Sequence, residues 1–260
     1  MLNGKVVTRD IKKLKVRLMT KQSIDFDGMM RSIIQSRRRK NVPEDNVLHV
    51  SELATCLRKN YLHHKIFREH PADTLLIFEV GNLIHEHVSK MLKSNESVDR
   101  IVSEMPMWTY VAEGDFRISG TVDDLIIFKD GSELVLEKKS TSDLPPEPSE
   151  HHVSQINFYM KMLGVIDGQI AYFAKKNMKT KSFPVTLNEE LFKETIERAK
   201  KLAKCLKDKI IPEAESRLDK KKEWECRFCL YGDVCLGLPT QMCMDTTIKK
   251  EEDKNETKCA

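Results

Sequence analysis

At 260 residues, with 40% hydrophobic and 32% charged residues, the chain can form one folded domain with appendages. Its formal net charge of +4 is too small to indicate a partner. No stretch approaches the ~20 apolar residues of a membrane span and we recognise no signal peptide, so we expect a cytoplasmic protein that contacts no membrane. In that reducing compartment, seven cysteines indicate metal or cluster ligation before disulfides.

The first 47 residues predict a basic, mostly helical N-terminal extension. Residues 1–48 hold twelve lysines and arginines against five acidic residues, a net charge of +7. Such an arm favours a polyanion such as nucleic acid, although a solvated helical extension explains it equally well.

Two helices are predicted between residues 48 and 93. The first begins near Ser51 and Glu52 and contains Cys56. The second covers residues 74–93, where Gly81 and His85 stand four apart and share a face. Gly81 allows close approach to another backbone and His85 can reach across that contact, but a single histidine is more often a packed, hydrogen-bonded residue.

A strand over residues 101–112, with Pro106 indicating an edge or a bulge, precedes a predicted hairpin. The hairpin joins residues 118–128 to residues 133–139. With a three-residue loop ending at Gly131 in the left-handed conformation, Asp123 lies opposite Glu137. A two-residue loop would instead place Asp124 there.

The second hairpin strand alternates between two faces. Val135, Glu137 and Lys139 share one face, while Leu134 and Leu136 point to the other, into a core. Asp123, Glu137 and Lys139 therefore converge, and two close carboxylates repel each other unless a cation such as Mg²⁺ or Mn²⁺ lies between them. The simpler alternative is a solvated polar face.

Residues 143–149, with three prolines, predict a loop long enough to act as a flap beside these carboxylates. A helix over residues 151–163, ended by Gly164, places Gln155 and Tyr159 on one face. Gln155 can bind phosphate or backbone oxygen and Tyr159 can stack on a base, although a core role for Tyr159 is equally consistent.

Two further strands, over residues 168–175 and 181–187, precede a charged helix from Glu189 to Lys209 that Asn188 caps. Three cysteines then follow in a C-x₂-C-x₅-C pattern: Cys226, Cys229 and Cys235. A fourth ligand must come from elsewhere, with Cys56 as first candidate and Cys243 as second. The three-plus-one arrangement favours a [4Fe–4S] cluster over zinc, which remains the alternative. Residues 239–260 predict a disordered polar tail, and no role is assigned to Cys205, Cys243 or Cys259.

Five features in this order resemble the RecB-type PD-(D/E)XK nucleases, and specifically their iron–sulfur branch. They are Gly81-x₃-His85, Gly120-x₂-Asp123, Glu137-Lys138-Lys139, Gln155-x₃-Tyr159, and one early plus three late cysteines. The pattern is similar to that of the CRISPR-associated exonuclease family that acts in spacer acquisition. AddB-type helicase–nucleases share the cysteine layout, but on far longer chains with helicase motifs. The resemblance covers about residues 48–238.

The resemblance implies an α/β, restriction-endonuclease-like fold, a mixed sheet flanked by helices. It implies a nuclease core over residues 48–225 and an iron–sulfur segment over residues 226–238 that joins the early helix through Cys56. The implied site roles are metal ligation (Mn²⁺ or Mg²⁺) by His85, Asp123, Glu137 and the Lys138 carbonyl, water activation by Lys139, DNA contact by Gln155 and Tyr159, and a [4Fe–4S] cluster on Cys56, Cys226, Cys229 and Cys235. Lys138 departs from the family pattern, in which an apolar or aromatic residue is usual, and adds a third cation near the site.

The implied activity is 5′→3′ exonuclease cleavage of single-stranded DNA, with a CRISPR integrase complex as partner. A repair or mobile-element nuclease outside CRISPR and a catalytically weak DNA-binding adaptor are the alternatives. A zinc-bound nucleic-acid-binding module is a further one. The sequence does not indicate the oligomeric state.

Overall fold

Residues 25–36, 44, 46–111 and 116–237 are described by the computed structural model. The chain divides into two units, residues 1–39 and 40–260. In the first unit, helix α2 (Phe26–Ser36) begins where the Asp25 carboxylate accepts a hydrogen bond from the Gly28 amide at 3.0 Å. The rest of the predicted basic extension up to residue 43, and the predicted tail with Cys243 and Cys259, lie outside the described residues. None of the described helices is long and apolar enough to span a membrane.

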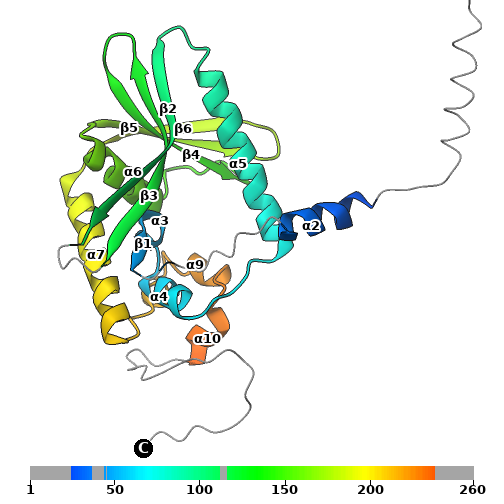
Figure 1. The fold of residues 1–260 in the computed structure, drawn as a ribbon, viewed down its shortest axis with the longest axis vertical. Helices are drawn as coiled ribbons and strands as arrows, with labels where there is room; N and C mark the ends of the chain where they lie inside the picture. Colours follow the sequence, from blue (N-terminus) through cyan, green and yellow to red (C-terminus); the bar gives the residue numbers. More distant parts are fainter. Residues whose placement is uncertain (1–24, 37–43, 45, 112–115, 238–260) are drawn as a thin grey trace, which may run out of the picture. The chain divides into compact units, whose positions relative to one another are not determined.

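The second unit is built on a mixed sheet (Figure 1). Its strands in the described residues are β1 (Val47–His49), β2 (Val98–Tyr110), β3 (Arg117–Phe128), β4 (Glu133–Thr141), β5 (Asp167–Ala174) and β6 (Thr180–Thr186). The order is β1-β3-β4-β5-β6, and β2 also pairs with β3. The β1–β3 and β4–β5 pairs are parallel, and the other pairs are antiparallel.

Strand β3 has two partners on one edge. Strand β2 pairs along nearly the whole of β3, so β1 and β4 must share the opposite edge. There β1 pairs with residues 117–119 and β4 with residues 124–127. Between these two partners, no strand of the described residues pairs with residues 120–123 on this edge. The Gly120-x₂-Asp123 motif therefore lies in a gap of the sheet.

The predicted hairpin register is confirmed. Asp124 pairs with Leu136 and Ile127 with Glu133, and the Phe128 amide donates to the Ser132 carbonyl at 2.9 Å. Gly131 has a φ of 85°, as the three-residue loop requires. Regular pairing stops at Asp124, because β4 continues beside β5 while β3 continues beside β2 (Figure 1). Asp123 and Glu137 thus stand where the two strands separate.

Each face of the sheet has its own core cluster. Helix α5 (Ala72–Leu92) covers one face, where Ile84 packs with Leu136 and Phe173. At Gly81 a Cβ atom would lie 3.0 Å from Ser140 Oγ on β4, so the close neighbour is a side chain rather than the backbone predicted there. The Leu134–Leu136 face is therefore buried as expected.

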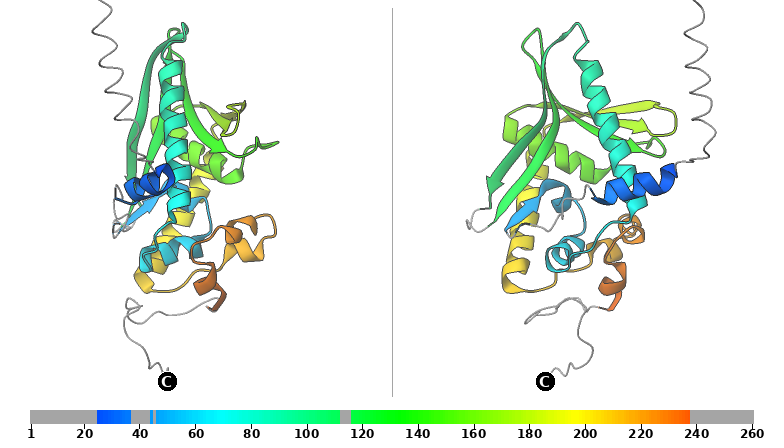
Figure 2. Two further views of the ribbon diagram at one scale, coloured as in Figure 1. Left: turned by 90° about the vertical axis from the view of Figure 1, so that its right-hand side faces the viewer. Right: turned by 45° about the vertical axis from the view of Figure 1, so that its right-hand side comes forward.

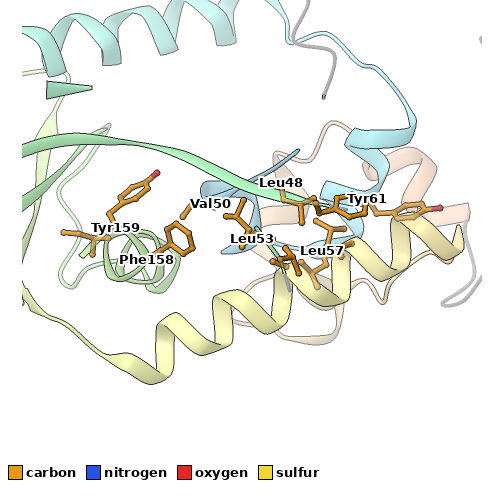
Figure 3. Packing of buried hydrophobic residues seen from close by; sticks show 14 of the residues in the cluster. Leu48, Val50, Leu53, Leu57, Tyr61, Phe158 and Tyr159 are labelled. Atoms are coloured by element: carbon orange, nitrogen blue, oxygen red, sulfur yellow. The ribbon is translucent and has the colours of Figure 1, made fainter. Parts of the chain in front are cut away.

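The larger cluster fills the opposite face. It joins α6 (Glu150–Leu163) and α7 (Glu189–Asp208) to the two short helices α3 (Val50–Leu53) and α4 (Leu57–Lys65). Figure 3 shows this cluster running beside α7, from Tyr159 and Phe158 on α6 to Tyr61 on α4. The predicted C-terminus of α6 and the predicted N-terminus of α7 are confirmed. Gly164 ends α6 with a φ of 72°, and the Asn188 side chain caps α7 by accepting a hydrogen bond from the Glu190 amide at 2.9 Å.

The prediction that Cys56 lies inside a helix is wrong. The chain leaves α3 after Leu53 and starts α4 at Leu57, so Cys56 is the residue that precedes α4. Its amide is thereby free of the helical ladder and donates to Glu225 Oε2 at 2.9 Å. The C-terminal helices α8 (Glu215–Leu218), α9 (Trp224–Arg227) and α10 (Gly232–Gly237) lie close to α4 (Figure 2).

Strand β2 is an edge strand, as Pro106 indicates, because it pairs only with β3 in the described residues. The irregularities lie elsewhere in the strand. The register shifts between Val98 and Arg100, and Glu104 adopts a left-handed φ of 52°. A left-handed residue interrupts the alternation of a strand and re-aims its side chain.

Candidate active site

The site is built around Asp123 in the gap of β3. Its Oδ2 accepts a hydrogen bond from the Lys138 amide at 2.7 Å, which bridges the point where β4 leaves β3. Its Oδ1 lies 3.7 Å from His85 Nδ1 on α5. Burial lowers the pKa of His85, against the opposing charge of Asp123, so the ring is neutral near pH 7 and can act as a ligand.

Glu104 joins this pair, and sequence analysis did not find it. One ligand atom each from His85, Glu104 and Asp123 lies within 4.8 Å of the others, the only such group among the described residues. Burial and the charge of Asp123 raise the pKa of Glu104. One nitrogen and two carboxylate oxygens form a donor set suited to Mn²⁺ or Mg²⁺. The register places Glu104 opposite Asp123, a signal available only once the β2–β3 pairing is known.

Glu137 supplies a buried carboxylate on the α6 side of the same gap. It is 1% exposed, and its Oε2 accepts no hydrogen bond from the described residues. Lys139 Nζ lies 2.5 Å from Oε1. Burial, opposed by Lys139, raises the pKa of Glu137 to about 7. A buried carboxylate with one oxygen left without a partner can be satisfied by a bound cation, so the residues fit a divalent metal. The solvated-face alternative is wrong.

Lys139 is held beside Glu137 by α6. Its Nζ donates to Gln155 Oε1 at 3.2 Å, and Gln155 Nε2 donates to the Tyr159 hydroxyl at 3.4 Å. Burial alone would lower the pKa of Lys139, but the charges of Glu137 and Asp123 outweigh it and raise that pKa. Lys139 therefore stays protonated.

Tyr159 is the buried end of the hydrogen-bonded chain that runs from Lys139 through Gln155. It is 2% exposed, and a Cβ atom at position 120 would lie 2.6 Å from its hydroxyl, which explains the glycine of the Gly120 motif. Figure 3 shows the ring inside the cluster with its hydroxyl turned outward. Base stacking needs an exposed ring face, which this packing does not offer. Burial, with the charge of Glu137, raises its pKa, so the hydroxyl keeps its proton.

Lys138 points to the opposite face of β4. Its Nζ lies 2.8 Å from Asp124 Oδ2, and it donates to Ser89 Oγ at 2.6 Å and to the His85 carbonyl at 3.1 Å. Lys138 and Asp124 are both 0% exposed. The third cation expected near the site is thus balanced by Asp124 and linked to the backbone of His85.

The four predicted cluster cysteines line one cavity of about 120 Å³: Cys56, Cys226, Cys229 and Cys235. All four are free thiols. Burial, together with neighbouring cysteines, raises the pKa of Cys226 and of Cys229.

A single tetrahedral zinc with Zn–S bonds of ~2.3 Å needs sulfurs about 3.8 Å apart. In the described part of the chain, no three of these sulfurs come within 4.8 Å of one another. The described residues therefore do not show these four sulfurs arranged as a preformed tetrahedral zinc site.

Comparisons with known proteins identify the family and the fold. The model of the PD-(D/E)XK nuclease superfamily matches residues 88–236. A CRISPR-associated exonuclease Cas4 of Saccharolobus solfataricus is 23% identical over 200 residues, which cover 75% of this chain and 90% of that protein. The solved structure of SSO0001 superposes with a TM-score of 0.58 at 18% identity and covers 80% of this chain and 95% of that one, so the two share a fold. An alkaline exonuclease from Laribacter hongkongensis has a TM-score of 0.39 at 9% identity over 71% of this chain and 93% of that one.

Proposed function

The chain belongs to the PD-(D/E)XK nuclease superfamily, and from this premise we propose that it is a metal-dependent DNA exonuclease that trims ends during CRISPR spacer acquisition. The observation that carries the proposal is the buried carboxylate of Glu137, whose Oε1 is paired with Lys139 and whose Oε2 has no hydrogen-bond partner among the described residues, across the gap from Asp123. The similarity of three quarters of the chain to a CRISPR-associated exonuclease supports the biological setting. We propose 5′→3′ polarity on single strands.

The metal-binding residues we propose are His85, Asp123, Glu137 and the Lys138 carbonyl, with Glu104 added from β2. A divalent ion, when bound, polarises phosphoryl oxygen and lowers the pKa of water. Protonated Lys139 donates hydrogen bonds to the attacking water and places positive charge beside the phosphate. Gln155 orients Lys139, and the Tyr159 hydroxyl positions Gln155.

The second cofactor we propose is a [4Fe–4S] cluster held by Cys56, Cys226, Cys229 and Cys235. Thiolates are the ligands such clusters use, and the shared cavity brings one early and three late cysteines together. The role is structural, because hydrolysis transfers no electrons. It connects the start of the nuclease core to its end and borders a passage for single-stranded DNA.

The partners we propose are single-stranded DNA, or DNA with single-stranded ends, and a CRISPR integrase complex. The basic N-terminal segment would guide DNA or dock on that complex. A cytoplasmic location stays a prediction.

The test is anaerobic purification of wild type, Asp123→Ala and the surface control Asp99→Ala, followed by an iron assay and digestion of end-labelled single-stranded DNA. We expect about four irons per chain in all three proteins. Cleavage should require Mn²⁺ or Mg²⁺ and be lost only in Asp123→Ala. Substrates blocked at the 5′ or the 3′ end then give the polarity.

Two results would contradict parts of this proposal. Iron without cleavage in wild type would support a DNA-binding adaptor. Zinc in place of iron would refute the cluster but leave the nuclease intact. Gene neighbourhood separates CRISPR adaptation from repair.

A further inference from the structure

Three aromatic rings, those of His151, His152 and Trp224, lie together at the start of α6. His151 lies one turn before Gln155 and two turns before Tyr159, so the three residues share one helix face. The ring of Trp224, the first residue of α9, lies on His151 with centroids 5.6 Å apart and an angle of 36°. His151 also contacts His152 at a centroid distance of 3.9 Å. Trp224 is 44% exposed, so part of its ring is open to solvent.

The rings of His151 and Trp224 border a cavity of about 800 Å³ that the proposed chemistry does not use. Its walls are the start of α6, the proline-rich loop at residues 146–149, α7, and residues 221–225. The positive charge of Lys139 reaches His151: burial first, and then this charge, lowers the pKa of His151 to about 4. Ser154 lines the cavity and precedes Gln155, which accepts the hydrogen bond from Lys139, so the cavity adjoins the active site. The His151 ring is uncharged at neutral pH.

Charge does not dominate this cavity. Lys221 and Lys222 face Glu147, Glu150 and Glu194. Two other charged residues on the wall have partners inside the fold. Arg198 binds the Leu53 and Thr55 carbonyls and Glu215, and Glu225 accepts from the Cys56 amide. A nearly neutral wall that includes the exposed ring of Trp224 suits a base rather than a row of phosphates.

We propose that Trp224 and His151 form a stacking site for a base of the single-stranded DNA substrate, immediately outside the active site. The proposal rests on the proposed nuclease function and deepens it. Trp224 is two residues from Cys226, so the cysteine segment positions this platform. Aromatic stacking tolerates any base, as an exonuclease that moves along a strand requires.

The chain contains two tryptophans, which makes a direct test possible. Trp108 is 56% exposed on the edge strand β2, where it contacts Tyr110, and serves as the matched control. In Trp108→Phe the emission comes from Trp224 alone, and in Trp224→Phe from Trp108 alone. Both full-length proteins are titrated with oligo(dT) without divalent metal, so that no cleavage occurs. Affinity for the same oligonucleotide is measured by anisotropy for wild type, Trp224→Ala and Trp108→Ala.

We expect oligo(dT) to quench the emission of Trp108→Phe and to leave that of Trp224→Phe unchanged. Trp224→Ala should bind about 5-fold to 100-fold more weakly than wild type, the loss of one stacked base. Because stacking is not ionic, this ratio should stay the same between 50 mM and 200 mM salt. Trp108→Ala should bind like wild type.

The inference is overturned if wild type binds and cleaves single-stranded DNA while the emission of Trp224 does not respond. Equal affinity of Trp224→Ala and wild type, at equal iron content, would also overturn it. Either result leaves the nuclease function standing. If wild type neither binds nor cleaves DNA, the proposed function fails first and the stacking site fails with it. The quenching measurement keeps Trp224 in place, so it remains decisive even if Trp224→Ala misfolds.

Discussion

Replacing Lys138 by methionine tests the buried ion pair behind the active site. Lys138 and Asp124 are both fully buried, with Nζ 2.8 Å from Oδ2. Methionine keeps most of the side-chain volume and removes the charge. The Asp124 carboxylate then keeps only the hydrogen bond from Ser89 Oγ, 2.9 Å from each oxygen. Breaking a buried pair in this way costs about 3–5 kcal/mol.

The expected loss of stability is large enough to measure. For a domain of this size, 1 kcal/mol corresponds to roughly 2–4 °C, so Lys138→Met should melt about 10 °C below wild type. Adding Asp124→Leu to Lys138→Met removes the unpaired charge and should restore most of the loss, because a buried ion pair and an apolar pair are similar in stability. The matched control is Lys90→Met on the same helix as Ser89. The Lys90 side chain is 67% exposed, and its ion-pair partner Glu86 also lies on the surface. This control should cost no more than about 1 kcal/mol.

The assay is thermal unfolding followed by circular dichroism, with iron content measured on each sample. The reasoning is refuted if Lys138→Met is as stable as Lys90→Met, or if the double variant is no more stable than Lys138→Met alone. Manganese affinity gives a second readout. Lys138 also donates to the His85 carbonyl, so the double variant should regain stability and still bind Mn²⁺ more weakly than wild type.

Three other changes have defined outcomes. Glu104→Gln should raise the Mn²⁺ concentration needed for half-maximal cleavage by roughly tenfold, and an unchanged metal titration would remove Glu104 from the ligand set. Gly120→Ala should cost about 1–3 kcal/mol in a urea titration, because the new Cβ would lie 2.6 Å from the Tyr159 hydroxyl, whereas Gly237→Ala, with open space around it, should be neutral. Burial lowers the pKa of His152 to about 2 from 6.5, so its stabilising contribution is complete above pH 6.5 and is lost as the pH falls, by about 1.4 kcal/mol per pH unit. His152→Gln should remove that part of the difference in stability between pH 7 and pH 5.5, and an unchanged difference would show that the ring is protonated in the folded state.

The parts of the site that lie close together in sequence could be predicted. Gly131 dictates the loop of the hairpin, the loop dictates the register, and the register brings Asp123 opposite Glu137. The alternation along β4 likewise separates Lys139 from Lys138. These predictions use only the backbone geometry of a turn and of a strand, which is determined by residues close together in sequence.

The sequence predictions that were missed or wrong concern residues whose positions depend on contacts between distant segments. Glu104 enters the site through the pairing of β2 with β3 and a left-handed backbone that no local pattern indicates. The helix predicted through Cys56 breaks because its amide is taken by Glu225, 169 residues away in sequence. Tyr159 is buried because Gly120 leaves room for it. In each case tertiary packing decides between conformations that are locally similar.

The cysteine cavity is enclosed by contacts that involve no cysteine side chain. The Cys56 amide binds Glu225, the Leu57 amide binds Glu215, and Arg68 holds both the Leu230 carbonyl and Asp233. The four thiols are therefore brought together by the folded polypeptide itself. If this cavity holds the proposed cluster, the cluster would enter a site whose walls the polypeptide already holds in place, so its insertion could follow folding.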